Sequence, residues 1–305
     1  MFNRIHHGKF KNDKQHSLRF HFKFSTSLLV RFAFCERDVG RSEDVENRPV
    51  LRQVVVRDGP TLSETRLPPG KMSLPGKAGL FCLASLCSWL WYQLYQFYRF
   101  KHKYGGEFTT RIVAGIHGVA CIILSCLALI YGPDPLDGIG EPNTFLQSLT
   151  MVISLGFFVY DFVWCVKYQP EIKIILAHHF GGIVSLTFIL CCGFSGAEAI
   201  AGLGSMEFTN PMVQARWFLR TFEKKDTILY QVVEYCFLVS FLTVRLGYGS
   251  CLFFAIMTSE KTLFMVKCCS LIMCGVSIAL IYNILQFISK KINDRNLEDD
   301  DIKLC

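Results

Sequence analysis

Long apolar runs, repeated along the chain, limit most strongly what this sequence can fold into. Residues 79–98 and 112–131 contain no acidic or basic residue apart from His117, and 144–165 contains only Asp161. A helix of about 20 apolar residues spans the ~30 Å hydrocarbon core of a bilayer. A chain of 305 residues cannot bury several such runs inside one soluble core. The pattern therefore predicts an integral membrane protein that crosses the bilayer several times.

Six hydrophobic spans can be placed from the sequence, at about 78–98, 112–131, 145–166, 171–192, 228–257 and 263–288. The segment 195–220 is ambiguous, because it carries Glu198, Glu207, Pro211 and Arg216. If it also crosses, every short basic loop lies on the cytosolic side, as the positive-inside rule requires. The alternative is a re-entrant loop buried within the protein. We expect an all-α, multi-pass transmembrane bundle of about seven helices, six plus one that is polar or re-entrant.

Charge divides the chain into three parts. Residues 1–76 hold 14 Lys and Arg against 8 Asp and Glu. We interpret them as a basic, disordered extension rather than a nucleic-acid-binding arm, because their charges alternate and no binding motif is present. Met72 directly precedes the first apolar run, and we expect residues 1–71 to be dispensable. Residues 77–289 form the predicted transmembrane domain, and 290–305 a short cytosolic tail.

Ionisable side chains inside the spans are the main functional signal. Each costs about 2.5–3.5 kcal/mol on insertion, so such residues usually serve a function or meet a partner. At ~1.5 Å per residue, they come from five helices to a similar level in the cytosolic half of the bilayer. The sequence therefore predicts one polar cavity that opens toward the cytosolic leaflet. The residues at this level are His117, Asp161, His178, His179, Glu207 and Glu234.

An imidazole next to a carboxylate can act as a general base or accept an acyl group. The candidate catalytic residues are therefore His178, His179, Asp161 and Glu207. The alternative is that these groups only satisfy one another and hold the helices in register. Five further residues are assigned to the lining of a lipid cavity: His117, Asn210, Arg216, Trp217 and Glu234.

The 14 cysteines do not form a metal-binding pattern. Paired CxxC spacings are absent, and so are the helical spacings Glu-x-x-His and His-x-x-x-His that often bind metals. We interpret most of the cysteines as small packing residues in the bilayer. The sequence thus indicates no metal and no cofactor.

Five short stretches form a distinctive set: EPNTFLQ at 141–147, LGFFVYDFVWCV at 155–166, LAHHFGGIVSL at 176–186, SGAEA at 195–199 and GSMEFTNPMVQARWFLR at 204–220. This set resembles the TLC domain family, which includes ceramide synthases and translocon-associated membrane proteins. The resemblance runs from about residue 79 to residue 288, and the E-x-x-N-P-x-x-x-x-R-W block beyond the His-His pair is its most specific part. It implies a TLC-type bundle. Within the family, the set is close to one particular member.

In the ceramide synthase branch, the His-His pair and a later pair of aspartates are associated with acyl transfer from acyl-coenzyme A to a sphingoid base. The resemblance carries over His178 and His179. It does not carry over the aspartates, because Glu207 and Asn210 stand where that branch has its His-Asp-x-x-Asp pattern. An amide can neither take up a proton nor supply negative charge at neutral pH. The resemblance to ceramide synthases is therefore incomplete at its catalytic positions.

Three functions fit the sequence. The first is handling or homeostasis of membrane lipid, sphingolipid or phospholipid, in which membrane lipid is the partner and nothing is turned over. The alternatives are an acyltransferase that uses acyl-coenzyme A and a lipid or proton-coupled transporter. By family analogy the protein is expected in the endoplasmic reticulum, with the plasma membrane as the alternative. No nucleic-acid partner is expected.

Overall fold

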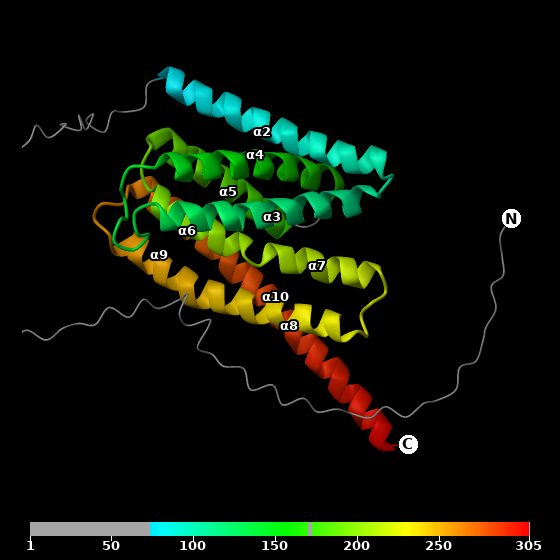
Figure 1. Ribbon diagram of the computed structural model, residues 1–305. Coiled ribbons are helices and arrows are strands. Elements are labelled where there is room, and N and C mark those ends of the chain that lie inside the picture. Colours follow the sequence, from blue (N-terminus) through cyan, green and yellow to red (C-terminus); the bar gives the residue numbers. More distant parts are fainter. Residues whose placement is uncertain (1–73, 170–172, 305) are drawn as a thin grey trace, which may run out of the picture. The chain divides into compact units, whose positions relative to one another are not determined.

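The computed structural model describes residues 74–169 and 173–304, so the predicted extension at 1–76 lies almost entirely outside the described residues. The described part of the chain is helical and has no strand, only an isolated bridge between Pro142 and Phe194. Figure 1 shows the helices packed side by side as a bundle. The prediction of an all-α, multi-pass bundle is confirmed.

The helices follow the predicted spans closely. They are α2 (Leu74–Lys101), α3 (Gly106–Ile130), α4 (Phe145–Tyr168), α5 (Lys173–Cys192) and α10 (Phe264–Leu304). The predicted span at 228–257 consists of α8 (Ile228–Leu242), a π-helical segment η1 (Thr243–Tyr248) and α9 (Gly249–Thr258).

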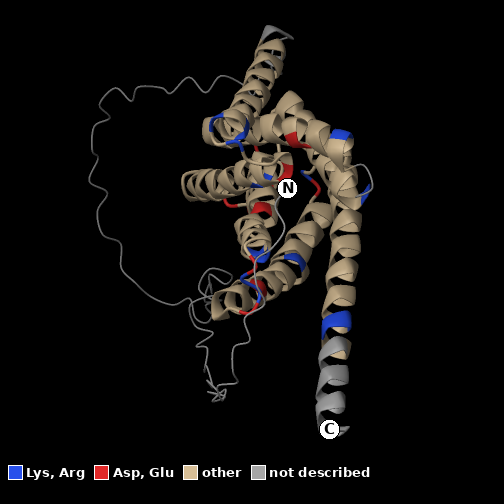
Figure 2. Cartoon of the chain, turned by 90° about the vertical axis from the view of Figure 1, so that its right-hand side faces the viewer, with Lys and Arg blue, Asp and Glu red and all other residues tan. Residues whose placement is uncertain are grey.

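Among the described residues, 5 helices are long and apolar enough to cross a membrane: α3, α4, α5, the α8–η1–α9 helix, and α10 up to Asn293. Most of their length carries no Lys, Arg, Asp or Glu, as Figure 2 shows. The 5 do not include α2, whose apolar residues are mixed with Trp, Tyr and Gln. α10 continues as a helix through the segment predicted as a tail.

The ambiguous segment 195–220 forms two short helices, α6 (Gly196–Glu207) and α7 (Asn210–Thr221). Figure 1 shows them end to end along the bundle. They run antiparallel to α3. A Cβ at Gly204 would lie 2.7 Å from Cβ of Ser125, and Arg111 near the start of α3 donates to Gln214 of α7 at 3.4 Å. The segment therefore passes along a membrane-length helix instead of returning as a re-entrant loop.

Local sequence explains the helix ends around this segment. Pro211 is the second residue of α7, and because proline lacks an N–H and its ring crowds the carbonyl four residues earlier, α6 cannot continue through it. At the other end of α6, Gly193 (φ 77°) and Ser195 (φ 72°) take left-handed conformations that reverse the chain after α5. Thr144 starts α4 with a capping box, in which its side chain and that of Gln147 bond each other's backbone N–H.

Contacts between helix ends show at which end of the bundle each loop lies. At one end, Asn143 N–H donates to the Gly193 carbonyl at 2.8 Å, and Gly140 packs against Lys261. At the other end, Phe108 packs on Phe218. The first end carries the loops that follow α3, α5 and α9, and the second carries the loops that follow α2 and α7. The chain thus alternates between the ends, as a multi-pass protein must.

A buried carboxylate ties α10 to α7 and α8 near the second end. Glu234 on α8 is 4% exposed. It accepts from Arg216 of α7 at 3.0 Å and from Tyr230 at 3.1 Å, and it also pairs with Lys291 of α10. Replacing one partner of a buried ion pair leaves the remaining charges uncompensated.

We therefore expect Glu234→Gln to lower the free energy of unfolding by about 2–4 kcal/mol, because Arg216 and Lys291 would lose their carboxylate. The matched control is Glu107→Gln, since Glu107 also pairs with an arginine at 3.0 Å but its side chain is 47% exposed. That control should cost less than about 1 kcal/mol. The measurement is thermal unfolding of the full chain in detergent, and equal shifts for the two variants would show that the Glu234 cluster is not an anchor.

Candidate functional site

The polar layer predicted from the sequence divides into separate groups. Asp161 pairs with His179, His117 lies beside Glu207, and Glu234 binds Arg216 and Lys291. His178 faces a different space, the cavity described below. The expectation that these residues share one polar cavity is therefore wrong. The depth of a residue in the bilayer can be estimated from its position along the helix, but the direction of its side chain cannot.

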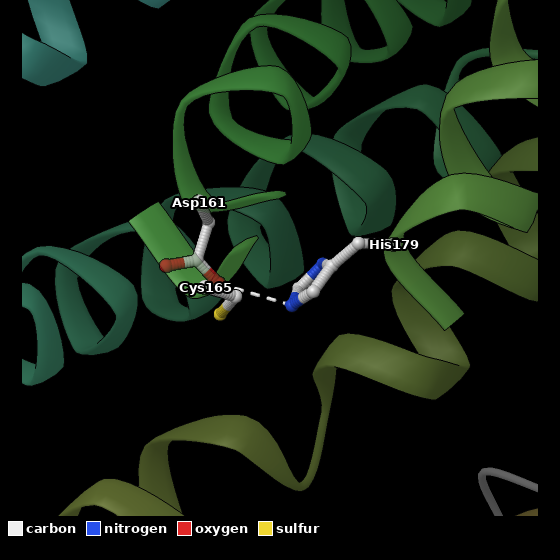
Figure 3. Close-up of side chains that lie close together, drawn as sticks. All are labelled: Asp161, Cys165 and His179. Carbon is white, nitrogen blue, oxygen red and sulfur yellow. Dashed lines mark ion pairs between the residues drawn. The ribbon is translucent and has the colours of Figure 1, made fainter. Parts of the chain in front are cut away.

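Asp161 and His179 form the closest imidazole–carboxylate pair among the described residues. His179 Nε2 lies 3.0 Å from Asp161 Oδ2, and the two side chains are 10% and 13% exposed. Thr110 of α3 donates to the other carboxylate oxygen, Oδ1, at 3.4 Å. Cys165 stands one turn after Asp161 on α4, and Figure 3 shows its thiol beside the pair. The pair and this thiol have come together from two consecutive helices.

Glu207 is held against α3. Its Oε2 lies 3.5 Å from Nδ1 of His117 and accepts a hydrogen bond from the Asn210 amide at 2.8 Å. Asn210 also donates to the carbonyl of Ala114 at 3.3 Å. His117 is fully buried and stacks on Phe157, with ring centroids 3.8 Å apart. The carboxylate at the break between α6 and α7 is thus paired inside the bundle.

Arg216 and Trp217, predicted to line a lipid cavity, lie near one end of the bundle. Arg216 joins the Glu234 cluster and lies over the Phe287 ring at 4.8 Å. Trp217 stacks under the Arg111 guanidinium at 4.5 Å. These contacts connect α7 to α10 and to α3, and neither residue lines the cavity found in the structure.

A largely apolar cavity of about 280 Å³ lies between α5, α6, η1–α9 and α10. On α10 its lining recurs at one-face helical spacing, from Val266 through Cys269, Met273 and Ser277 to Ile281. The fifteen residue steps from Val266 to Ile281 extend ~22 Å, so the lining follows a single face of α10 through most of the ~30 Å hydrocarbon core of a bilayer. The apolar walls include Leu186, Ile189, Leu252 and Ile256.

One histidine, one carboxylate and one arginine reach this cavity from different helices. His178 comes from α5, Glu198 from α6 and Arg245 from η1. Nδ1 of His178 and Oε2 of Glu198 are buried and have no hydrogen-bond partner among the described residues. The other carboxylate oxygen of Glu198 accepts from the Gly140 backbone at 3.0 Å. The cavity therefore combines a long apolar wall with polar atoms that have capacity left for a ligand.

Arg245 lies on the π-helical segment, where the helix is locally wound more loosely. Such π-bulges are frequently found at functional sites. Arg245 donates to Ser277 Oγ of α10 at 2.7 Å and lies over the Phe241 ring at 4.7 Å. The sequence shows Arg245 as an intramembrane charge, but no motif in it marks the π-helical segment that carries this residue.

Of the four candidate catalytic residues, the structure brings together His179 and Asp161, and it places Glu207 and His178 elsewhere. His178 and His179 differ by ~100° around α5, which explains why they face different spaces. From the sequence, Cys165 was interpreted with the other cysteines of the spans as a packing residue. The signal that could have singled it out is the four-residue spacing from Asp161, which puts both side chains on one face of α4.

Comparison with known proteins shows which family the chain is similar to. The family model of the TLC domain matches residues 107–289. TLC domain-containing protein 4 A of Dictyostelium discoideum is 22% identical over 142 residues, 46% of this chain and 55% of that protein. TLC domain-containing protein 4-B of Xenopus laevis is 25% identical over 162 residues, 50% of this chain and 58% of that protein. The chain thus spans little more than half the length of these curated relatives. No solved structure matches it significantly.

The matched region begins at the start of α3 and ends within α10, so it contains nearly all of the 5 apolar spans, together with the broken α6–α7 segment and the cavity. It covers well over half of the 305 residues. The resemblance derived from the sequence motifs is confirmed at the level of the family. This chain is a multi-pass membrane protein of the TLC domain family.

Proposed function

We propose that this protein binds a membrane lipid, with one hydrocarbon chain of the lipid in the cavity between α5, α6, η1–α9 and α10. The observation that carries the proposal is the elongated apolar lining along one face of α10, with polar groups at His178 and Arg245. A volume of about 280 Å³ is close to the lower end of small-molecule sites, ~300–1,000 Å³.

The polar groups suggest which end of the lipid they contact. Arg245 is charged and already bonded to Ser277, so its remaining N–H groups can donate to a carbonyl, carboxylate or phosphate oxygen. The unpartnered Nδ1 of His178 can accept from, or donate to, the same part of a ligand. We infer that an ester, amide or acid group lies near these two residues and that the chain extends toward Leu252 and Ile256.

This role fits the lipid handling or homeostasis expected from the family. We keep the endoplasmic reticulum and a sphingolipid or phospholipid partner as part of the proposal, by family analogy. The bundle end that carries Arg111, Lys167 and Arg220 is proposed to face the cytosol, following the positive-inside rule. The narrower motif resemblance, to TLC domain-containing protein 5 (transmembrane protein 136), also stays a proposal, since both relatives described above are named TLC domain-containing protein 4.

Filling the cavity should remove the lipid. Gly202 lines the cavity, and a Cβ there would meet only Leu252, at 3.9 Å, so Gly202→Phe can place its ring in the cavity without a backbone clash. The matched control is Gly275→Phe, because Gly275 lies on the exposed side of α10 with nothing within 4 Å of its Cβ position.

We expect lipid retained per chain after detergent exchange, measured by lipid mass spectrometry, to fall at least about tenfold in Gly202→Phe, equivalent to ~1.4 kcal/mol. Gly275→Phe should retain as much as the unmodified protein. Circular dichroism should show the same helix content for all three proteins. Equal retention by the two variants would mean that the lipid does not bind in this cavity.

Acyl transfer is the second candidate function, and the position of His178 favours it. An acyl group carried on this imidazole would have its chain directly inside the apolar cavity. In such a step the ring nitrogen attacks the thioester carbonyl of acyl-coenzyme A, the C–S bond breaks and the thiol leaves with a proton. Glu207 and Asn210 do not line the cavity, so the acid pair of the synthase branch has no equivalent there.

Incubation with acyl-coenzyme A, followed by peptide mass spectrometry, distinguishes the two functions. The binding proposal predicts lipid in the cavity with no acylated histidine at any chain length. An enzyme predicts an adduct on His178 that is absent from His178→Gln. The control His102→Gln alters an exposed histidine at the end of the bundle and should change neither result.

A further inference from the structure

We propose that Asp161, Cys165 and His179 bind a single divalent metal ion of the zinc type between α4 and α5. The ligand atoms of the three residues all lie within 4.8 Å of one another. Figure 3 shows Asp161 and Cys165 of α4 next to each other and close to His179 of α5, with a dashed line joining the carboxylate to the imidazole. None of these residues lines the lipid cavity, so this proposal stands or falls independently of lipid binding.

The geometry fits a tetrahedral ion after small side-chain movements. Zinc bonds to nitrogen, oxygen and sulfur of about 2.0–2.3 Å place ligand atoms of a tetrahedral site roughly 3.3–3.8 Å apart. The observed Nε2–Oδ2 distance of 3.0 Å and the 4.8 Å limit for the group bracket this range. Asp161 and Cys165 are four residues apart on one helix, so the backbone presents both to the same point.

The surroundings orient the ligands and exclude water. Thr110 donates to Oδ1 of Asp161, which leaves Oδ2 directed at His179. Thr110 is itself paired with the Tyr160 hydroxyl at 3.2 Å. Taken as whole residues, backbone included, Cys165 is 6% exposed and His179 8%. Nδ1, the other ring nitrogen of His179, has no hydrogen-bond partner among the described residues. The polar contact of this ring is therefore the one between Nε2 and Asp161.

Charge gives a second, independent reason. A divalent ion bound by one carboxylate, one thiolate and one neutral imidazole forms a neutral complex, which suits a low-dielectric environment far better than isolated charges do. A thiolate and an imidazole favour zinc or another late transition metal over magnesium or calcium. Three protein ligands leave a fourth position for water or another small ligand, as in catalytic zinc sites.

The site also has a route for the ion. Cys165 stands three residues before the end of α4 at Tyr168, and His179 follows the start of α5 at Lys173 by less than two turns. The group is therefore near one end of the bundle, close to the water on that side. The absence of Glu-x-x-His and His-x-x-x-His spacings does not bear on it, because its ligands are an Asp-x-x-x-Cys pair and a histidine of the next helix.

Cobalt spectroscopy on the purified full chain in detergent tests the proposal. After treatment with a chelator, the protein is titrated with Co²⁺. We expect one ion per chain, visible bands of tetrahedral intensity and a thiolate-to-cobalt charge-transfer band in the near ultraviolet, all displaced by Zn²⁺. Cys165→Ser should lose the charge-transfer band and bind Zn²⁺ at least about tenfold more weakly. Cys126→Ser, at an exposed cysteine of α3, should behave like the unmodified protein.

A second measurement needs no variant. Zinc should protect Cys165 from alkylation, and a chelator should remove the protection, as mapped by peptide mass spectrometry. The proposal is overturned if the unmodified protein shows no charge-transfer band, if the band persists in Cys165→Ser, or if zinc protects a different cysteine. Any of these results would leave Asp161 and His179 as an ion pair without a metal, and it would not affect the lipid cavity.

Discussion

The structure depends on one constraint: within the apolar interior of the bilayer an unpaired polar group is costly, so charged side chains are held by partners in the protein. The clearest case is the break between α6 and α7. Its carboxylate, Glu207, lies beside His117 and accepts from Asn210, while Asn210 also donates to the backbone of α3. Unsatisfied groups in hydrocarbon cost several kcal/mol each, so these contacts allow a proline-broken, charged segment to run along α3. With that segment in place, α5, α9 and α10 surround the cavity beside it.

Much of the fold could be predicted from the sequence, because a bilayer requires each spanning helix to be both long enough and apolar enough to cross it. The predicted span at 145–166 became Phe145–Tyr168, and that at 112–131 became Gly106–Ile130. Basic residues in the short loops also indicated that 195–220 crosses, and the structure runs it along α3. In each case a single physical quantity, the free energy of transferring residues into hydrocarbon, dominates the outcome.

The arrangement of the polar residues could not be predicted in the same way. Their depth follows from residue number, but the direction of each side chain depends on how a helix is rotated against its neighbours. His178 and His179 illustrate this, since one faces the cavity and the other faces Asp161. Arg245 is a further case, since no sequence motif marks the π-helical segment that carries it or its contact with Ser277 of α10. The sequence thus identified nearly all of the buried histidines and charged residues, but it did not predict which of them contact one another.

The proposal that this protein holds a lipid within the bundle depends on the cavity between α5, α6, η1–α9 and α10. The apolar lining of the cavity would hold the hydrocarbon chain, and His178 and Arg245 would contact the polar end of the lipid. A density map at near-atomic resolution of the full chain in lipid nanodiscs would test this most directly. The account predicts elongated density between α5 and α10, with its polar end at Arg245. A cavity closed by direct packing of α10 on α5 and α6, or one with no such density, would contradict it.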